Sequence, residues 1–150
     1  MFGARQDDFE QVREIMDPGL VELVEVGRGL KASDVARARI DQSVYAATWA
    51  EWTLGYDLLL TPALAVPAFD VETLAPPGWE SDAYWLKWSP FSYPFNMTQQ
   101  PACSVPCGFT TDRLPVGLQI VADCYREDLV LRAAAAFEAT QPAVRWPGQG

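Results

Sequence analysis

The 150-residue sequence contains no histidine. Histidine is the usual side chain for proton transfer at neutral pH, so its absence excludes Ser-His-Asp and Cys-His catalysis and zinc sites built on imidazole. Lysine is scarce too, because only Lys31 and Lys87 occur. A Ser-Lys site stays conceivable, but neither lysine lies in a sequence context that marks it as a base.

Phosphate-binding glycine loops and basic patches are also missing. Gly27 and Gly29 lack a third glycine and follow a predicted helix instead of a strand, so we interpret them as a helix end. Acidic residues outnumber basic ones by 20 to 11, for a formal net charge of −9. Nucleic acid and anionic membranes bind clustered Lys and Arg, so we expect neither as a partner.

The sequence has no apolar run of the ~20 residues that a membrane span needs. The segment LLLTPALAVPAF, residues 58–69, is short and contains two prolines. Residues 1–11 have neither the apolar core of a signal peptide nor the Arg-rich, acid-poor composition of a transit peptide. We therefore expect a cytoplasmic protein.

Cysteine occurs three times, as Cys103, Cys107 and Cys124. Cys103 and Cys107 lie in a strand-like segment, hence roughly 13 Å apart at ~3.3 Å per residue, which is too far for a disulfide. We expect them to be small buried apolar residues. No metal site and no cofactor are predicted.

The composition that remains is typical of a folded protein, with 49% hydrophobic and 21% charged residues. A chain of this length fits one domain, predicted to span residues 1–150. Its first part, residues 8–55, has helical periodicity. Asp17-Pro18 is expected to cap and restart a helix there, and Ser33 is expected to cap the next one.

Residues 56–66 form a continuous apolar run bounded by prolines, which predicts a strand buried on both faces. Residues 70–95 have no periodicity and predict a long loop, of the kind that is usually functional or mobile. This segment is rich in aromatic residues: Trp79, Tyr84, Trp85, Trp88, Phe91, Tyr93 and Phe95.

Residues 102–122 alternate between apolar and polar and predict an antiparallel hairpin, in which Pro106 places its strand at an edge or at a bulge. An amphipathic helix is expected at residues 127–139. The class is therefore α/β, with helices flanking part of a mixed β-sheet, and the strand order cannot be read from the sequence.

The segment PFNMTQQPACSVPCGFTTDRLPVGLQIVADCYREDLVLRAAAAFE, residues 94–138, resembles the C-terminal pattern of the amidase signature family. That pattern has Phe-Asn, a Thr-Gly-Gln-Pro-like turn, a Ser-Val-Pro strand, a Val-Gly-Leu-Gln strand and a helix that ends in Ala-Phe-Glu. Upstream, YDLLLTPA at residues 56–63 resembles the family's strand that ends in Thr-Pro. The helical stretch at residues 17–38 is similar too, so the resemblance covers most of the chain after about residue 8.

Members of this family hydrolyse linear amides with a serine nucleophile, a second serine in a cis peptide and a lysine base. Backbone amides of a glycine- and serine-rich stretch stabilise the oxyanion. The present sequence has no Gly-Gly and no Ser-Ser pair. The resemblance therefore implies the C-terminal portion of the amidase-signature fold, which supplies scaffold and pocket wall but no catalytic residue and is inactive alone.

By resemblance, the candidates for substrate contact are Thr61, Pro62, Phe95, Asn96 and Gln100. The alternative interpretations are that Asn96 only ties down turn backbone and that Phe95 belongs to the core. The substrate would be a small-molecule amide, bound when the chain is joined to the missing N-terminal part.

Two departures from the family pattern concern specificity and backbone. Members that use glutamine and depend on tRNA carry an acidic residue shortly before Phe-Asn, where this chain has residues 89–92, Ser-Pro-Phe-Ser, and this weakens an amidotransferase assignment. Gln99 stands where a glycine is usual. The aromatic loop favours an apolar or aromatic acyl group, with surface packing by tryptophan as the alternative.

Three hypotheses for the whole chain follow. The first is an inactive amidase part whose exposed apolar surface is covered by its missing partner or by homo-oligomerisation. The second is a non-catalytic module that completes a split amidase or binds another protein. The third, hydrolysis through Cys103, Cys107 or Ser104, lacks any residue that would activate those groups.

Overall fold

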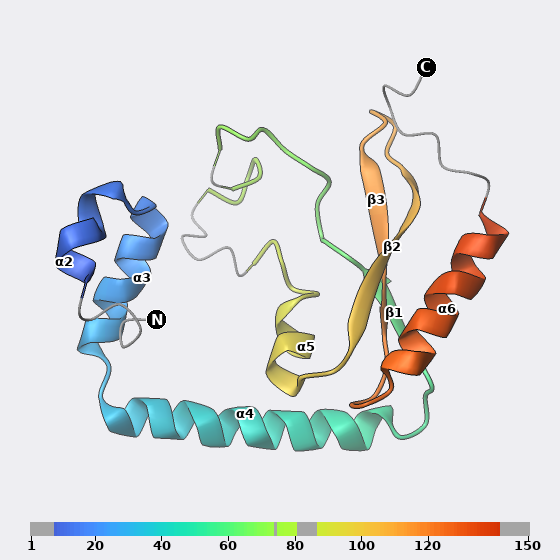
Figure 1. Cartoon of the computed structure of the whole chain (residues 1–150), viewed down its shortest axis with the longest axis horizontal. Helices are drawn as coiled ribbons and strands as arrows, with labels where there is room; N and C mark the ends of the chain where they lie inside the picture. Colours follow the sequence, from blue (N-terminus) through green and yellow to red (C-terminus); the bar gives the residue numbers. More distant parts are fainter. Residues whose placement is uncertain (1–7, 74, 81–86, 142–150) are drawn as a thin grey trace. The chain divides into compact units, whose positions relative to one another are not determined.

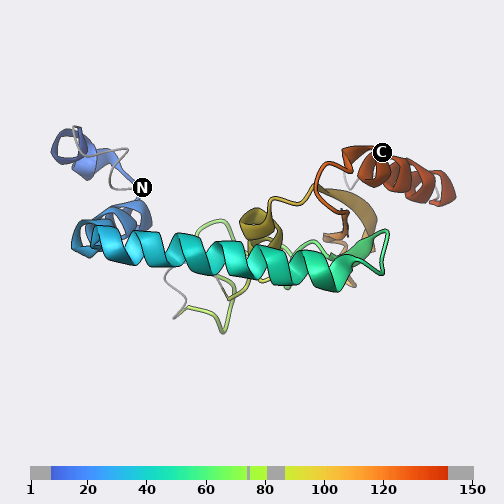
Figure 2. The ribbon, with the colours of Figure 1, turned by 90° about the horizontal axis from the view of Figure 1, so that it is seen from below.

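The computed structural model describes residues 8–73, 75–80 and 87–141 (Figure 1). The chain falls into two compact units, residues 1–42 and 43–150, and each is described by itself. Helix α4 (Ala32–Thr53) contains the boundary between them and is continuous across it (Figure 2). The prediction of one domain over the whole chain stays a prediction.

The first unit is a helical hairpin. Its elements before α4 are α2 (Phe9–Val12), the 3-10 helix η1 (Arg13–Ile15) and α3 (Pro18–Gly29). Asp17 caps α3, because the Leu20 N–H donates to Asp17 Oδ1 at 3.1 Å, and Pro18 is the first helical residue. The chain therefore turns at the Asp17-Pro18 step, where the sequence indicates a restart.

Packing inside this hairpin joins α2 to α3. Phe9 and Val24 are fully buried. The Arg28 guanidinium lies over the Phe9 ring at 4.8 Å and pairs with the Glu10 carboxylate. Its hydrogen bond to Glu10 lowers the pKa of that carboxyl. A cation and a ring thus hold the short helix against the longer one.

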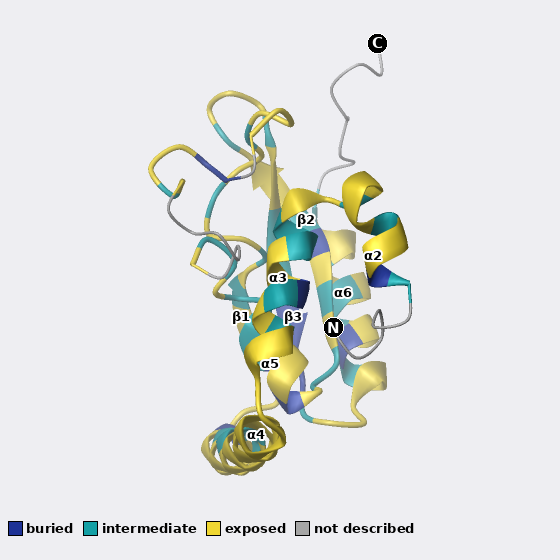
Figure 3. Cartoon of the chain, turned by 90° about the vertical axis from the view of Figure 1, so that its left-hand side faces the viewer, coloured by how far each residue is buried: buried dark blue, intermediate teal, exposed yellow. Residues whose placement is uncertain are grey.

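The prediction that Ser33 caps the next helix is wrong. Helix α4 begins at Ala32, and the Lys31 N–H donates to the Asp34 carboxylate at 2.9 Å. An acidic side chain in the first helical turn can reach back to a free N–H, which is one half of a capping box. Figure 3 shows that α4 is almost wholly exposed.

The second unit contains a three-stranded antiparallel sheet in the order β1-β3-β2 (Figure 1). The strands are β1 (Leu59–Pro62), β2 (Ala102–Phe109) and β3 (Pro115–Val121). Together with the flanking helices, this sheet confirms the α/β class. Strand β1 is shorter than the predicted run of residues 56–66, and one further hydrogen bond to β3 follows it, from the Ala63 N–H to the Gly117 carbonyl oxygen at 2.9 Å.

Burial of β1 on both faces, as the sequence predicts, is wrong. Leu60 is 56% exposed, although Ile120, its partner on β3, is only 2% exposed. An apolar run does not tell whether a second layer covers both faces of the strand that it forms.

Strand β2 is an outer strand of the described sheet, and its register to β3 shifts between Pro106 and Gly108. Edge position and bulge therefore occur together at Pro106, whose nitrogen faces the outer edge, so the missing N–H costs no hydrogen bond to β3. Gly108 has φ +146°, a conformation that side chains rarely adopt. In the loop between β2 and β3, the Thr110 N–H donates a hydrogen bond to the Leu114 carbonyl oxygen at 2.8 Å.

Helix α6 (Glu127–Thr140) packs against β2 and β3. Val130 is buried, while Ala133, Ala134 and Phe137 are half-buried on the same side. None of the helices in the described ranges is long and apolar enough to cross a membrane.

Helix α5 (Tyr93–Thr98) occupies the end of the predicted loop at residues 70–95. Pro94 lies in its first turn, where the missing N–H costs nothing. In the rest of this segment, the Trp88 ring meets the Phe69 ring edge-on at 5.4 Å. Tyr84 and Trp85 lie outside the described residues.

The close approach of the three strands generates a first prediction. A Cβ on Gly117 would lie 2.6 Å from Ser104 Oγ and 2.9 Å from Ala63 Cβ. We expect Gly117→Ala to lower the free energy of unfolding by about 1–3 kcal/mol, because the strands must move apart. Urea unfolding followed by tryptophan fluorescence measures it.

The matched control is Gly55→Ala, whose Cβ would meet nothing within 4 Å. Equal stability of the two variants would contradict the close approach.

Candidate functional site

The residue pairs across the strands show which side chains share each face of the sheet. Cys103 and Ile120 are paired, and the charge of Glu138 on α6 acts on Cys103, so these side chains lie on the face that α6 covers. Side chains alternate along a strand, so Thr61 and Gln119 lie on the opposite face.

Gln119 joins three segments on this opposite face. Its Nε2 donates to Thr61 Oγ1 at 3.0 Å and to the Phe91 carbonyl oxygen at 2.9 Å. A carbonyl can only accept, so the orientation of the Gln119 amide is fixed. The Thr61 hydroxyl in turn donates to the Pro62 carbonyl oxygen at 3.0 Å. We call this arrangement of Gln119, Thr61 and Phe91 the Gln119 clasp.

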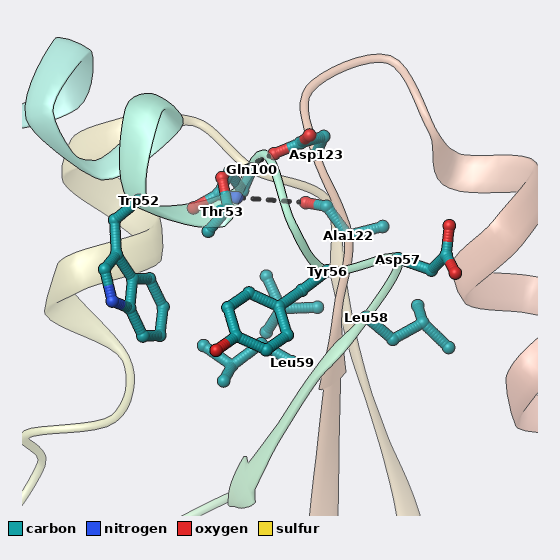
Figure 4. A pocket seen from close by; sticks show the side chains of 10 residues that line it. Trp52, Thr53, Tyr56, Asp57, Leu58, Leu59, Gln100, Ala122 and Asp123 are labelled. Atoms are coloured by element: carbon teal, nitrogen blue, oxygen red, sulfur yellow. Dashed lines mark hydrogen bonds between the residues drawn. The ribbon is translucent and has the colours of Figure 1, made fainter.

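Gln100 belongs to a second polar group, beside the residues that follow β3 (Figure 4). Its Nε2 donates to the Ala122 carbonyl oxygen at 3.2 Å, and its Oε1 accepts from Thr98 Oγ1 at 2.9 Å. Beside it, Thr53 Oγ1 donates to Asp123 Oδ1 at 2.9 Å and so ties the end of α4 to the residues after β3.

These residues border a cavity of about 200 Å³ (Figure 4). Its walls include Trp52, Tyr56, Leu58, Leu59, Gln100 and Asp123. The Trp52 and Tyr56 rings lie 5.5 Å apart, and both are largely exposed. The cavity is thus apolar and aromatic on one side, with the amide of Gln100 and the carboxylate of Asp123 on the other.

The structure does not gather the five predicted contacts around one point. Gln100 lines the cavity, while Thr61 is engaged in the Gln119 clasp. Pro62 and Asn96 are exposed. Phe95 is 5% exposed and meets the Trp49 ring edge-on at 5.7 Å, as the core interpretation requires. All five remain predicted substrate contacts.

Gln119 is the polar residue that the sequence analysis missed. A signal existed, because Gln119 is the one amide side chain in the alternating stretch from Val116 to Val121. Its partners, however, lie 58 and 28 positions away in the sequence. No local pattern could have identified them.

The described aromatic residues of the loop pack against the chain itself. Trp88 and Trp79 are half-buried. The Trp88 Nε1 has no hydrogen-bond partner in the described part of the chain. This packing fits the structural interpretation of these tryptophans, and their role in substrate choice remains a prediction.

Gln99 adopts the left-handed conformation, with φ 60° and ψ 29°, directly after α5. This is where the resemblance places a glycine, and the reason is physical, since residues that follow a helix C-terminus are often left-handed and glycine is free of the Cβ penalty there. The turn keeps its backbone at the expense of strain in Gln99.

We expect Gln99→Gly to stabilise the chain by about 0.5–1 kcal/mol, because relief of the Cβ clash exceeds the added freedom of the unfolded chain. Urea unfolding measures the change. Gln99→Ala is the control, since alanine keeps the Cβ and should bring no gain. A gain in both variants would show that the strain does not come from φ.

The three cysteines are free thiols in different surroundings. Cys103 is half-buried, and burial, reinforced by the charge of Glu138, raises the pKa of its thiol. Cys107 and Cys124 are exposed. The expectation that Cys107 is buried is therefore wrong, and Cys107 is the bulged residue of β2, between Pro106 and Gly108. In the described ranges, no group of three or more His, Cys, Asp or Glu could hold a metal.

A difference in thiol reactivity follows. At about pH 8 we expect iodoacetamide to alkylate Cys103 more slowly than Cys107 and Cys124, because a raised pKa and burial both reduce the accessible thiolate. Peptide mass spectrometry reads out each site. In urea the three rates should converge. A Cys103 rate equal to the others in the native chain would contradict the placement of this thiol.

Comparison with known proteins shows which families and proteins this chain resembles. The family model Amidase matches residues 12–131. The acylamidase of Rhodococcus erythropolis is 41% identical over 138 residues, which cover 90% of this chain and 29% of that protein. A glutamyl-tRNA(Gln) amidotransferase subunit of Streptococcus equi subsp. zooepidemicus is 42% identical over 85 residues, 57% of this chain and 16% of that protein.

Among solved structures, 6-aminohexanoate cyclic dimer hydrolase complexed with substrate is similar with a TM-score of 0.77 and 29% identity. The similarity covers 89% of this chain and 30% of the hydrolase. This chain therefore spans less than a third of each of these relatives. The match over most of its length shows that the chain belongs to the amidase signature family.

Proposed function

We propose that this chain is the C-terminal part of an amidase-signature hydrolase of linear amides, and that it supplies scaffold and pocket wall. In this proposal it is inactive alone. The observation that carries the proposal is the combination of a family match over residues 12–131 with a span of only 29% of the acylamidase. The sequence contains no Gly-Gly or Ser-Ser pair that could belong to the signature stretch.

The side chains that are present support an accessory role. Amide hydrolysis needs an activated nucleophile and preorganised donors for the oxyanion. Cys103 is unsuited to the first task, because its raised pKa keeps the thiol protonated. Hydroxyls such as Thr61 and Thr53 are engaged in hydrogen bonds to neighbouring segments.

A pocket wall would be built from side chains that the structure holds in place. The Gln119 clasp holds the Phe91 backbone against the sheet, and Gln100 presents its amide at the cavity beside Tyr56. In the proposal these groups orient a small amide substrate, with its acyl part against apolar surface. The names of two relatives, an acylamidase and a cyclic-dimer hydrolase, agree with amide substrates.

Between an amidase and an amidotransferase, we favour the amidase. The segment before Phe95, residues 89–92, contains no acidic residue, whereas by resemblance the members that use glutamine carry one there. The similarity to the amidotransferase covers only 57% of the chain, against 90% for the acylamidase.

A second function, a non-catalytic module that completes a split amidase, is favoured by apolar side chains at the surface of the second unit. Exposed examples are Val44, Trp52, Leu54, Tyr56, Leu60 and Leu64. A partner or a second copy of the chain would cover such a surface. A cytoplasmic location stays part of the proposal.

The test compares three proteins for release of ammonia or amine from aliphatic and aromatic amides. They are the 150-residue chain, the acylamidase as positive control, and a hybrid in which this chain replaces the aligned acylamidase segment. We expect no release by the chain and clear release by the hybrid.

The other outcomes are equally informative. A folded but inactive hybrid would contradict the wall function. Turnover by the chain alone that survives repurification would contradict inactivity, and substitution of Lys31, Lys87, Ser104 and the cysteines would then locate the responsible group.

A further inference from the structure

Gln119 holds one end of a segment that carries several of the predicted substrate contacts. One hydrogen of its Nε2 group is donated to the Phe91 carbonyl oxygen at 2.9 Å, and the other is donated to Thr61 Oγ1 at 3.0 Å. The segment that begins at Phe91, residues 91–100, includes helix α5. Its predicted substrate contacts are Phe95, Asn96 and Gln100.

The other end of residues 91–100 is held by backbone as well as by a side chain. Gln100 Nε2 donates to the Ala122 carbonyl oxygen at 3.2 Å (Figure 4). The Ala122 N–H donates to the Pro101 carbonyl oxygen, also at 3.2 Å. The chain then enters β2 at Ala102 and pairs with β3. This end does not depend on one side chain.

The first end has less support in the described part of the chain. Residues 88–92 form turns, in which the Ser92 N–H donates to the Ser89 carbonyl oxygen at 3.3 Å. The Trp88 ring meets Phe69, but Phe69 lies outside the strands. Among the described residues, the Gln119 amide provides the hydrogen bond that joins residues 88–92 to the sheet.

The Gln119 clasp also holds the two predicted contacts on β1. The Thr61 hydroxyl accepts from Gln119 and donates to the Pro62 carbonyl oxygen, so two hydrogen bonds set its orientation. Gln119 is therefore bonded to both segments that carry predicted contacts, β1 and residues 91–100. Because both of its donors are engaged, it is suited to holding these segments and not to binding a substrate carbonyl.

We propose that Gln119 is a positioning residue of the pocket wall, which fixes the start of α5 against β3 and thereby sets which acyl groups the wall accepts. This rests on the proposed function and adds a specificity-determining residue to it. The side chains whose backbone the clasp holds are aromatic, namely Trp88, Phe91, Tyr93 and Phe95. The selectivity concerned is therefore for aromatic over small aliphatic acyl groups.

The first measurement is amide hydrogen exchange of residues 91–98, read by peptide mass spectrometry in the acylamidase hybrid. Gln119→Met removes both donors and keeps the length of the side chain. We expect these amides to exchange at least about tenfold faster in the variant, because the start of α5 loses its hydrogen bond to the sheet. Unchanged exchange would overturn the proposal.

Gln119→Glu repeats this measurement with a side chain of nearly the same shape. It replaces the donor group by an oxygen, which cannot donate to the Phe91 carbonyl when ionised. The same amides should exchange at least as fast as in Gln119→Met. A glutamate variant that exchanges as slowly as the unchanged hybrid would contradict the role of the Gln119 donors.

Val130→Ala is the control for a general loss of stability. Val130 is 3% exposed and lies on α6, which covers the opposite face of the sheet. Its truncation should lower the melting temperature without a selective acceleration of exchange at residues 91–98. The same selective acceleration in this control would show that Gln119 acts only through stability, and would overturn the proposal.

The second measurement compares kcat and KM of the hybrid for an aromatic and a small aliphatic amide. We expect Gln119→Met to lower the preference for the aromatic amide, as a ratio of kcat/KM values, by about tenfold. The change should lie mostly in KM, because the catalytic groups of the hybrid come from the acylamidase. Val130→Ala should leave the ratio unchanged. An unchanged ratio in Gln119→Met would overturn the proposal.

This proposal and the proposed function fail in different ways. A folded hybrid that hydrolyses no amide, but exchanges faster at residues 91–98 in Gln119→Met, would contradict the wall function and support the tie between Gln119 and α5. An active hybrid in which Gln119→Met changes neither exchange nor preference would support the wall function and overturn the role of Gln119.

Discussion

Strand β3 is hydrogen-bonded on both edges, and the arrangement of the second unit depends on this double pairing. It brings β1 and β2, which are about forty positions apart along the chain, to either side of one short strand. The constraint is tightest at Gly117, where the missing side chain lets Ala63 and Ser104 approach. Helix α6 then has a flat surface to cover, and Gln119 has Thr61 and the Phe91 carbonyl within reach.

Features that depend on neighbouring residues could be predicted from the sequence. Asp17-Pro18 restarts a helix because both residues act on their own turn. Pro106 predicts an edge or a bulge because a strand residue without an N–H is tolerated only at such places. The family could be inferred from residues 94–138 for a related reason, since its strands and turns follow each other closely along the chain.

Features that depend on distant residues could not be predicted. Leu60 and Ile120 are both apolar strand residues, and only the placement of α6 makes one exposed and the other buried. The partners of Gln119 are set by strand register and by a loop. The sequence names Gln100 as a site residue but does not show that Ala122 and Thr98 hold its amide in place.

The two outer strands share one detail with a consequence for the chain in concentrated solution. Pro62 ends β1 and Pro106 interrupts β2. Each lacks an N–H, so neither described edge offers an unbroken row of donors. Open-ended addition of strands, edge to edge, into fibrils needs such a row to repeat without limit. The two prolines therefore oppose amyloid growth at the edges of the described sheet.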